Sequence, residues 1–477
     1  TNIINGTINK TNIFNSMGNV QVLNVVTKNT FVYVAGVFSD SMLDLEDFTG
    51  ISVKDSLTNN GAMDLFVAQY SLEQILILRF KISGTRSDNN IDMYITNTDI
   101  FLSGIFTSFP LNFYDMRDNI SSNLISDGNP SAFVCRYNTE GTLIWNFRIL
   151  GIDSTSTPTK IVVDEVGGFV YVVGTYSRNL KIYDTAHNTN PVFTYMYTGT
   201  APEIFIAKFT INGVWVWTSH ITGNCVVRSL VLNPLTRCPL FGIEYGSMLT
   251  FYQSDNITIN GNLSLDGIQN LGIVEYQSNG TFLDVVKIGG SNVDSGIQLD
   301  INENTLAVAG LYSSNPISFF QSDGGVGSNL EINGQHNNIF IAKYNLAVMP
   351  GKKIYTWATN IYNDSANSAP VSISLTEATE LFDTTQFLVM GNYTSLLKFN
   401  SFDSINSTGI FYELGQDLIN NLSVSNTFIA NYDTNGKFQY RSYIVAPLGG
   451  SSIGHDIDAH SNSLFIAGTF LGNVDVY

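Results

Sequence analysis

Apolar and polar residues alternate in short runs along the chain, and one five-residue run returns at nearly regular intervals. It begins with Phe, ends with Tyr or Phe, and alternates large and small residues between them. A period of two predicts a β-strand at each copy. The clear copies are Phe66–Tyr70, Phe133–Tyr137, Phe205–Phe209, Phe340–Tyr344 and Phe428–Tyr432, and Gly272–Tyr276 is a divergent sixth.

A second recurring signal is an apolar run that ends in glycine. Its copies end at Gly36, Gly104, Gly174, Gly242, Gly310, Gly391 and Gly468, which lie 68 to 81 residues apart. This regular spacing indicates an internal repeat rather than a series of unrelated strands. The glycine signal occurs seven times and the Phe-to-Tyr signal six times. This difference indicates a circular array in which the chain starts partway through a repeat.

Each repeat divides into four expected strands. A moderately polar first strand, such as 160–164 or 296–300, precedes the glycine-ending second strand. A polar insertion of variable length, longest at 400–425, separates the second strand from the Phe-to-Tyr third strand. The fourth strand follows a turn glycine, and such turns between apolar runs favour tight hairpins. These turn glycines are Gly141, Gly213, Gly280 and Gly436.

Such units predict an all-β fold, a seven-bladed β-propeller of four-stranded blades, because a closed ring leaves no apolar strand edge open. A solenoid of the same repeat would need capping repeats at its ends, and none is visible. The N- and C-terminal strands are expected to combine in one blade and close the ring. The expected blades of this single domain (1–477) are 19–82, 91–149, 158–221, 226–288, 294–361, 369–444, and 453–477 plus 1–18.

The amino-acid composition and net charge limit which kinds of partner the chain is expected to bind. The chain is 44% hydrophobic and 13% charged with 40 Gly, which is typical of a large core joined by many turns. Its net charge of −18 repels phosphate backbones and anionic membranes, so no nucleic acid is expected as a partner. No apolar run is long enough to cross a bilayer, and we expect a soluble chain without membrane insertion. The first residues lack the basic and apolar regions of a signal peptide. Because the chain starts without Met, removal of a signal peptide or of a longer upstream segment stays an open alternative.

No set of side chains forms a catalytic or cofactor-binding pattern, so the sequence predicts neither an enzyme nor a cofactor. The strongest polar signal is Asp164, Asp300 and Asp458, each ten residues before a second-strand glycine. We interpret them as turn residues that accept backbone N–H bonds. The alternative is a ring of metal or substrate ligands at the mouth of a central tunnel.

Histidine and cysteine add no metal site to this picture. His455 and His460 are close in sequence, but a five-residue spacing on a strand puts them on opposite faces. The three cysteines, Cys135, Cys225 and Cys238, have no metal-binding spacing. We expect Cys225 and Cys238 at opposite ends of one hairpin, too far apart for a disulfide.

Three further groups of residues are expected to have roles other than catalysis or ligand binding. Trp145, Trp217 and Trp357 share one position of the fourth strand, where packing between blades is expected. Asp44, Glu46 and Asp47 are expected in a solvated acidic loop. Asn-x-Ser/Thr sequons cluster in insertions and turns, which predicts a glycosylated outer surface if the protein follows a secretory route. The candidate asparagines are Asn119, Asn256, Asn262, Asn406 and Asn421.

The repeat resembles the bacterial-type β-propeller repeat called SBBP, over nearly the whole chain. Residues 133–137 with Gly141 and Trp145, followed by 161–164 and 170–174, match its pattern almost residue by residue. The resemblance implies the propeller fold and occurrence in surface or secreted proteins, and it implies no catalytic residues. The abundance of Asn, Ile, Tyr and Phe, whose codons are AT-rich, points to a genome such as that of a large DNA virus.

Departures from the SBBP pattern mark individual repeats. Asp284 stands at the tryptophan position of the repeat that also lacks the third-strand Phe, and the last two repeats carry insertions. We expect these blades to be the least regular.

The favoured function is a non-enzymatic structural or interaction protein that binds partner proteins or assembles with itself through the blade insertions. Its expected place is a virion or cell surface, or outside the cell, with the cytoplasm as the alternative. Two other functions stay open. One is a propeller that binds glycans or another ligand, and the other is a hydrolase or lyase with a site at the tunnel mouth.

Overall fold

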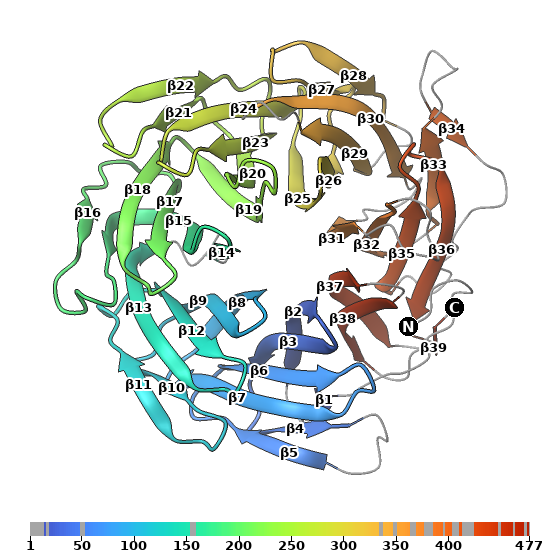
Figure 1. The fold of residues 1–477 in the computed structure, drawn as a ribbon. Coiled ribbons are helices and arrows are strands. Elements are labelled where there is room, and N and C mark those ends of the chain that lie inside the picture. Colours follow the sequence, from blue (N-terminus) through green and yellow to red (C-terminus); the bar gives the residue numbers. More distant parts are fainter. Residues whose placement is uncertain are drawn as a thin grey trace. The chain divides into compact units, whose positions relative to one another are not determined.

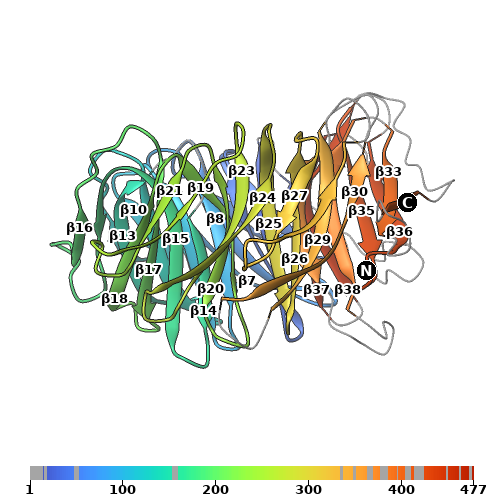
Figure 2. The ribbon, with the colours of Figure 1, turned by 90° about the horizontal axis from the view of Figure 1, so that it is seen from above.

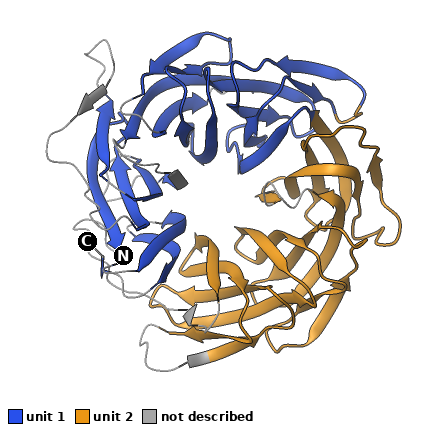
Figure 3. Ribbon diagram, turned by 180° about the vertical axis from the view of Figure 1, so that it is seen from behind, with its two compact units in different colours: residues 1–8, 222–253, 257–477 blue, residues 9–221, 254–256 orange. Residues whose placement is uncertain are grey.

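The computed structural model consists of antiparallel β-strands, and the described residues contain no helix. Contacts divide the chain into unit 1 (1–8, 222–253 and 257–477) and unit 2 (9–221 and 254–256), which Figure 3 colours separately. The description covers all residues except 1–13, 16–18, 48–52, 153–158, 333–336, 347–350, 363–368, 376–384, 395, 403–409, 413–423, 447–449, 461–462, 472–474 and 477.

Unit 2 contains three four-stranded modules, which Figure 1 labels by strand. Module A consists of β2 (Val20–Lys28), β3 (Phe31–Phe38), β6 (Asp64–Ser71) and β7 (Leu76–Gly84). Module B consists of β8 (Asp88–Ile95), β9 (Asp99–Phe106), β12 (Ser131–Asn138) and β13 (Leu143–Ile152). Module C consists of β14 (Lys160–Asp164), β15 (Phe169–Ile182), β17 (Glu203–Thr210) and β18 (Trp215–Thr222). The shorter strands are β1 (Phe14–Asn15), β4 (Met42–Glu46), β5 (Val53–Thr58), β10 (Leu111–Tyr114), β11 (Ile120–Leu124) and β16 (Phe193–Tyr195).

Unit 1 repeats the arrangement three times. Module D consists of β19 (Cys225–Leu232), β20 (Pro239–Tyr245), β23 (Asn270–Tyr276) and β24 (Phe282–Gly289). Module E consists of β25 (Asp294–Asn302), β26 (Thr305–Tyr312), β29 (Asn338–Leu346) and β30 (Lys353–Tyr362). Module F consists of β31 (Ala369–Leu375), β32 (Phe387–Tyr393), β35 (Asn426–Tyr432) and β36 (Phe438–Val445). The remaining strands are β21 (Leu249–Tyr252), β22 (Ile259–Leu263), β27 (Ile317–Phe320), β28 (Val326–Leu330), β33 (Lys398–Phe402), β34 (Ile410–Tyr412), β37 (Ser451–His460), β38 (Ser463–Leu471) and β39 (Asp475–Val476).

The two recurring sequence signals pair with each other. The glycine of the second strand lies opposite the Phe of the third strand, as in Gly36↔Phe66 and Gly174↔Phe205. A Cβ on Gly174 would lie 2.7 Å from a ring atom of Phe205, so only glycine leaves room for the ring. The same pairing recurs at Gly104↔Phe133, Gly310↔Phe340 and Gly391↔Phe428.

The hairpin between the third and fourth strands confirms the expected turn glycines. Gly141, Gly213, Gly280 and Gly436 have φ between 74° and 86°. A register shift follows at the last residue of the Phe-to-Tyr run in each of these modules. This combination is a turn closed by a β-bulge, for which glycine is favoured because a left-handed backbone strains other residues.

The insertions have a different structure from the one expected. Those in modules B, E and F fold into two-stranded hairpins, and each pairs with the end of the fourth strand of the preceding module: β10 with β7, β27 with β24, and β33 with β30. The end of β15, extended by β16, pairs with β13 in the same way. The described insertions thus widen the sheet of the neighbouring module. Partner binding through the insertions stays a prediction.

Apolar side chains fill the space between successive modules. Separate clusters join module A with B, B with C, D with E, and E with F. In Figure 2, the long strands within each unit run in similar directions across the molecule. Trp145, Trp217 and Trp357 are 9%, 7% and 1% exposed, so the packing role expected for the shared tryptophan position is confirmed.

The tryptophan position also has a polar role. Trp145 Nε1 donates to the carbonyl of Ile211 in the turn of the next module at 3.1 Å, and Arg136 Nη1 donates to the same oxygen at 3.1 Å. In unit 1, Trp357 Nε1 donates to the equivalent carbonyl of Thr434 at 2.9 Å. The fourth strand of one module therefore holds the turn of the next one.

Candidate functional site

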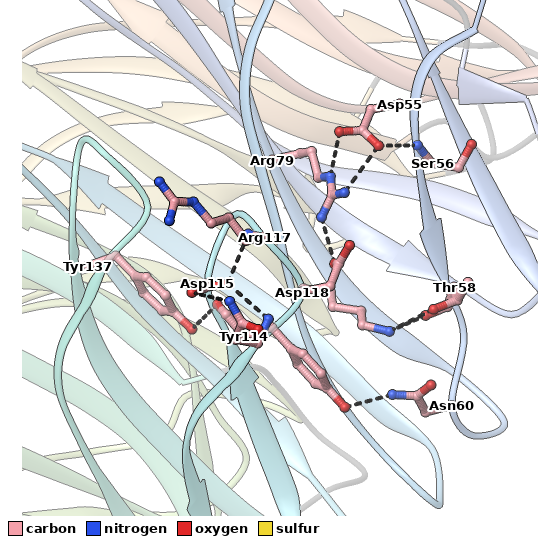
Figure 4. A network of polar contacts seen from close by, with 12 residues as sticks. Asp55, Ser56, Thr58, Asn60, Arg79, Tyr114, Asp115, Arg117, Asp118 and Tyr137 are labelled. Carbon is pink, nitrogen blue, oxygen red and sulfur yellow. Dashed lines mark hydrogen bonds and ion pairs between the residues drawn. The ribbon is translucent and has the colours of Figure 1, made fainter.

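The first candidate site is a polar network where two insertion hairpins meet the fourth strand of module A (Figure 4). The guanidinium of Arg79 on β7 makes two hydrogen bonds to the Asp55 carboxylate on β5, at 2.9 and 3.1 Å. Its remaining terminal nitrogen donates to Asp118 at the tip of the β10–β11 hairpin, at 2.6 Å. The hydrogen bond from Arg79 is the main cause that lowers the pKa of Asp55.

Neighbouring residues extend this network along both hairpins. Lys81 Nζ donates to the carbonyl and hydroxyl oxygens of Thr58, at 2.6 and 3.0 Å. Asn60 Nδ2 donates to the hydroxyl of Tyr114 at 2.8 Å, and Tyr137 donates its hydroxyl to the carbonyl of Tyr114 at 3.1 Å. These hydrogen bonds hold the two insertion hairpins against the strands of modules A and B. The network therefore has a structural role.

Exposed apolar side chains recur near the start of the fourth strand in all three modules of unit 2. We call Ile75, Ile77, Ile144, Val214 and Val216 the strand-four residues. They are 51%, 48%, 49%, 39% and 39% exposed. Each lies within three residues of the buried Leu78, Trp145 or Trp217. Because these exposed residues recur at equivalent positions of three modules, they are candidates for contact with another macromolecule. The alternation of apolar and polar residues in the fourth strands carries this signal in the sequence.

A buried charged cluster replaces the tryptophan contact in module D. Lys353, at the start of β30, places Nζ 2.9 Å from Oε2 of Glu275 and 3.2 Å from Oδ2 of Asp284. Glu275 stands where Arg136 and Lys343 stand in other repeats, and Asp284 takes the tryptophan position. In modules B and E the tryptophan at this position donates to a turn carbonyl of the next module. In module D the next module places the Lys353 cation at this contact, and an aspartate stands in place of the tryptophan.

The three aspartates predicted from spacing have different surroundings. Asp164 accepts a hydrogen bond from the backbone of Gly167, within the turn that follows it, at 2.9 Å. Asp458 accepts from the backbone of Ala459 at 3.0 Å. Asp300 instead reaches the next module, where Oδ2 accepts from the backbone of Leu375 at 2.6 Å. Their role as ligands of a metal or substrate stays a prediction.

Asp300 has the most perturbed surroundings of the three. Burial raises its pKa to about 7, and the charges of Asp458 and Asp456 raise it further against the hydrogen bonds from Leu375 and Ile301. The first strands of unit 1 therefore bring these carboxyl groups near one another. Among the described residues, no group of three or more His, Cys, Asp or Glu side chains has a metal-binding arrangement.

The acidic group of the first insertion was placed wrongly by the sequence. Asp44 and Glu46 lie on β4, and Asp47 is 8% exposed directly after it. Asp44 Oδ1 accepts a hydrogen bond from the Ser56 hydroxyl across the hairpin at 2.7 Å. The residues alternate with the buried Leu43 and Leu45, and this period-two pattern, which predicts a strand, outweighs their charge.

The sequons differ in whether the side-chain nitrogen of the asparagine is exposed for the attachment of a glycan. Asn262 is exposed on β22, and Asn119 is exposed in the β10–β11 hairpin. Asn256 Nδ2 donates to the carbonyls of Thr218 and Ser254, at 2.7 and 3.1 Å, so the nitrogen that would carry a glycan is engaged. Asn406 and Asn421 lie outside the described residues. Glycosylation stays a prediction.

The cysteines agree with the sequence, and His220 is buried in unit 2. That His455 and His460 lie on opposite faces stays a prediction. All three cysteines are free and buried. Cys225 pairs with Tyr245 at one end of the β19–β20 hairpin, while Cys238 adjoins its turn, which confirms the expected register. His220 is buried beside Tyr195, with Nδ1 2.8 Å from Oδ1 of Asn256, and burial lowers its pKa. No helix among the described residues is long and apolar enough to cross a membrane.

Taken together, the described residues define a repeat protein made of four-stranded antiparallel modules that are joined by insertion hairpins. The chain is 26% identical, over 233 residues, to an uncharacterized WD repeat-containing protein of Acanthamoeba polyphaga mimivirus. The match covers 46% of this chain and 16% of the relative, so the chain spans a small part of that protein. No family model matches.

A solved structure of the WD40 β-propeller domain of Doa1 is similar at 13% sequence identity. The similarity covers 59% of this chain and 94% of that domain, with a TM-score of 0.19. A TM-score this low carries no argument about the fold. The SBBP resemblance therefore stays a prediction, and the relative from a giant virus agrees with the genome suggested by the AT-rich codons.

Proposed function

We propose that this chain is a non-enzymatic protein-interaction scaffold. The observation that carries the proposal is the recurrence of the strand-four residues in three successive modules. These side chains face solvent although the cores beside them are fully packed, so they are free to bury apolar area against a partner. The WD-repeat relative from a giant virus supports the same class of function.

A comparison of two surface variants tests this function. The test variant carries Ile75→Glu, Ile144→Glu and Val216→Glu, one change in each module of unit 2. The control carries Val166→Glu, which alters an apolar residue that is 85% exposed in a turn of module C. After cross-linking in the native source and mass spectrometry, we expect specific protein partners with wild type and control and their loss with the test variant. Equal recovery of partners by all three would contradict the proposal, provided that circular dichroism shows folded variants.

We also propose that the modules are blades of a seven-bladed propeller displayed on a virion or cell surface, with the blade boundaries given by the repeat. The pairing of β1 with β4 supports closure by the two ends, because in modules B, E and F the insertion hairpin pairs with the fourth strand of the preceding module. In this proposal, residues 14–15 supply the fourth strand of the seventh blade.

Removal of residues 1–18 tests this closure. The deletion takes away the partner of Leu45 and Asp44 on β4 and leaves an open strand edge. We expect a lower melting temperature or aggregation in size-exclusion chromatography. A deletion variant that stays monomeric, with an unchanged melting temperature, would show that closure is made elsewhere.

A further inference from the structure

The buried cluster of Lys353, Glu275 and Asp284 holds the three groups that amide formation between side chains requires. The side chain of Lys353 is 0% exposed, that of Glu275 is 1% exposed and that of Asp284 is 16% exposed. We propose that Lys353 and Asp284 become joined by an isopeptide bond, with Glu275 as the proton carrier.

The geometry holds the lysine nitrogen against both carboxylates. Nζ contacts Glu275 Oε2 at 2.9 Å, Asp284 Oδ2 at 3.2 Å and the carbonyl of Gly351 at 3.3 Å, so three oxygens surround its three donor positions. Separations of about 3–3.5 Å between reacting groups are those at which an intramolecular reaction gains most from fixed orientation. The fold therefore supplies the positioning that free lysine and aspartate lack in water.

The surroundings of the two carboxylates assign their roles. Glu275 is fully buried, and Asn233 Nδ2 donates to its other oxygen at 3.2 Å, which fixes it for proton transfer. Asp284 is partly exposed, so a released water molecule has a path to solvent. The hydroxyl of Ser322 lies 2.6 Å from Asp284 Oδ2 and can donate to the oxygen that leaves.

The reaction conserves atoms and charge without an oxidant or a further reactant. The Lys353 ammonium first gives a proton to Asp284, which leaves a neutral amine and a neutral carboxylic acid. The amine then forms a bond to Cγ of Asp284, and Glu275 takes a proton from the nitrogen. Glu275 passes this proton to the departing hydroxyl, the C–O bond breaks, and one water molecule leaves as the amide forms.

Mass spectrometry of the purified wild-type protein tests the bond directly. We expect an intact mass lower than the sequence mass by one water, and a proteolytic peptide pair linked through Lys353 and Asp284. The Lys160–Asp92 pair, at 2.9 Å but 21% and 12% exposed, serves as an internal control and is expected to be unlinked. A folded protein with the full sequence mass, or a link from Lys353 to Glu275, would overturn the proposal.

Two variants separate the bond from the ion pairs. Glu275→Gln keeps Lys353 beside Asp284 but removes the proton carrier, and we expect the full sequence mass with the fold retained. Lys353→Arg keeps a cation that cannot form this amide and is expected to be unlinked as well. A link that forms as completely in Glu275→Gln as in wild type would overturn the role given to Glu275.

Discussion

At the scale of single residues, the second-strand glycine has the clearest physical role. Gly174→Val would bring side-chain atoms against the Phe205 ring, because even a Cβ lies 2.7 and 2.9 Å from its ring atoms. We expect a loss of roughly 3 kcal/mol in the free energy of unfolding, the upper range for overpacking, measured by urea denaturation. Gly174→Ala combined with Phe205→Leu should lose less than the two single changes added together. Strict additivity would mean that the glycine does not make room for the ring.

Buried aspartates make stability depend on pH. Burial raises the pKa of Asp88 and Asp294 to about 6 and that of Asp64 to about 7, as it does for Asp300. In the unfolded chain these groups lose their protons near pH 3.9. The folded state thus retains protons on these four groups that the unfolded state has lost. Their contribution to stability is fully present below about pH 4 and is lost as the pH rises through about 6 to 7.

We therefore expect a lower melting temperature at about pH 8 than at about pH 5. Asp300→Asn removes one of the groups responsible and should flatten this dependence. The net charge of −18 acts in the same direction in both proteins, so the difference between them isolates the contribution of Asp300. Parallel curves of melting temperature against pH for wild type and variant would refute this assignment.

At the scale of elements, the insertion hairpins depend on the Arg79 network. Arg79→Ala removes the hydrogen bonds to Asp55 and Asp118, whose side chains are 43% and 45% exposed. Because solvent screens such pairs, we expect a loss of only about 1 kcal/mol in urea denaturation, together with faster proteolysis in the β10–β11 hairpin. Arg117→Ala is the matched control, since it alters an exposed arginine of the same hairpin. Similar proteolysis of the two variants would show that Arg79 does not hold the hairpins.

The sequence predicted the strands of each module better than the connections between modules. Second and third strands carry a strong local pattern, and the Gly174–Phe205 pairing follows from it. The insertions carry no shared pattern, and their partner is the fourth strand of another module, so neither periodicity nor turn residues could identify the pairing. The role of Asp284 was hidden for a similar reason, because its cation Lys353 lies 69 residues later in the chain.

At the scale of the whole molecule, neighbouring modules are joined in three ways within each unit. Apolar clusters fill the space between them, fourth-strand side chains hold the turn of the next module, and insertion hairpins extend the sheet of the preceding one. The modules therefore depend on their neighbours for stability. The packed modules hold the exposed strand-four residues in fixed positions.

The insertions of modules B, E and F are strands paired with the preceding module and not unpaired loops. Hydrogen–deuterium exchange of the native protein, followed by peptide mass spectrometry, tests this claim most directly. We predict that the paired amides of β10 and β27 exchange slowly, at rates close to those at the ends of β7 and β24 with which they pair. Exchange of β10 and β27 at the rate of an unprotected chain, while β7 and β24 remain protected, would contradict the account.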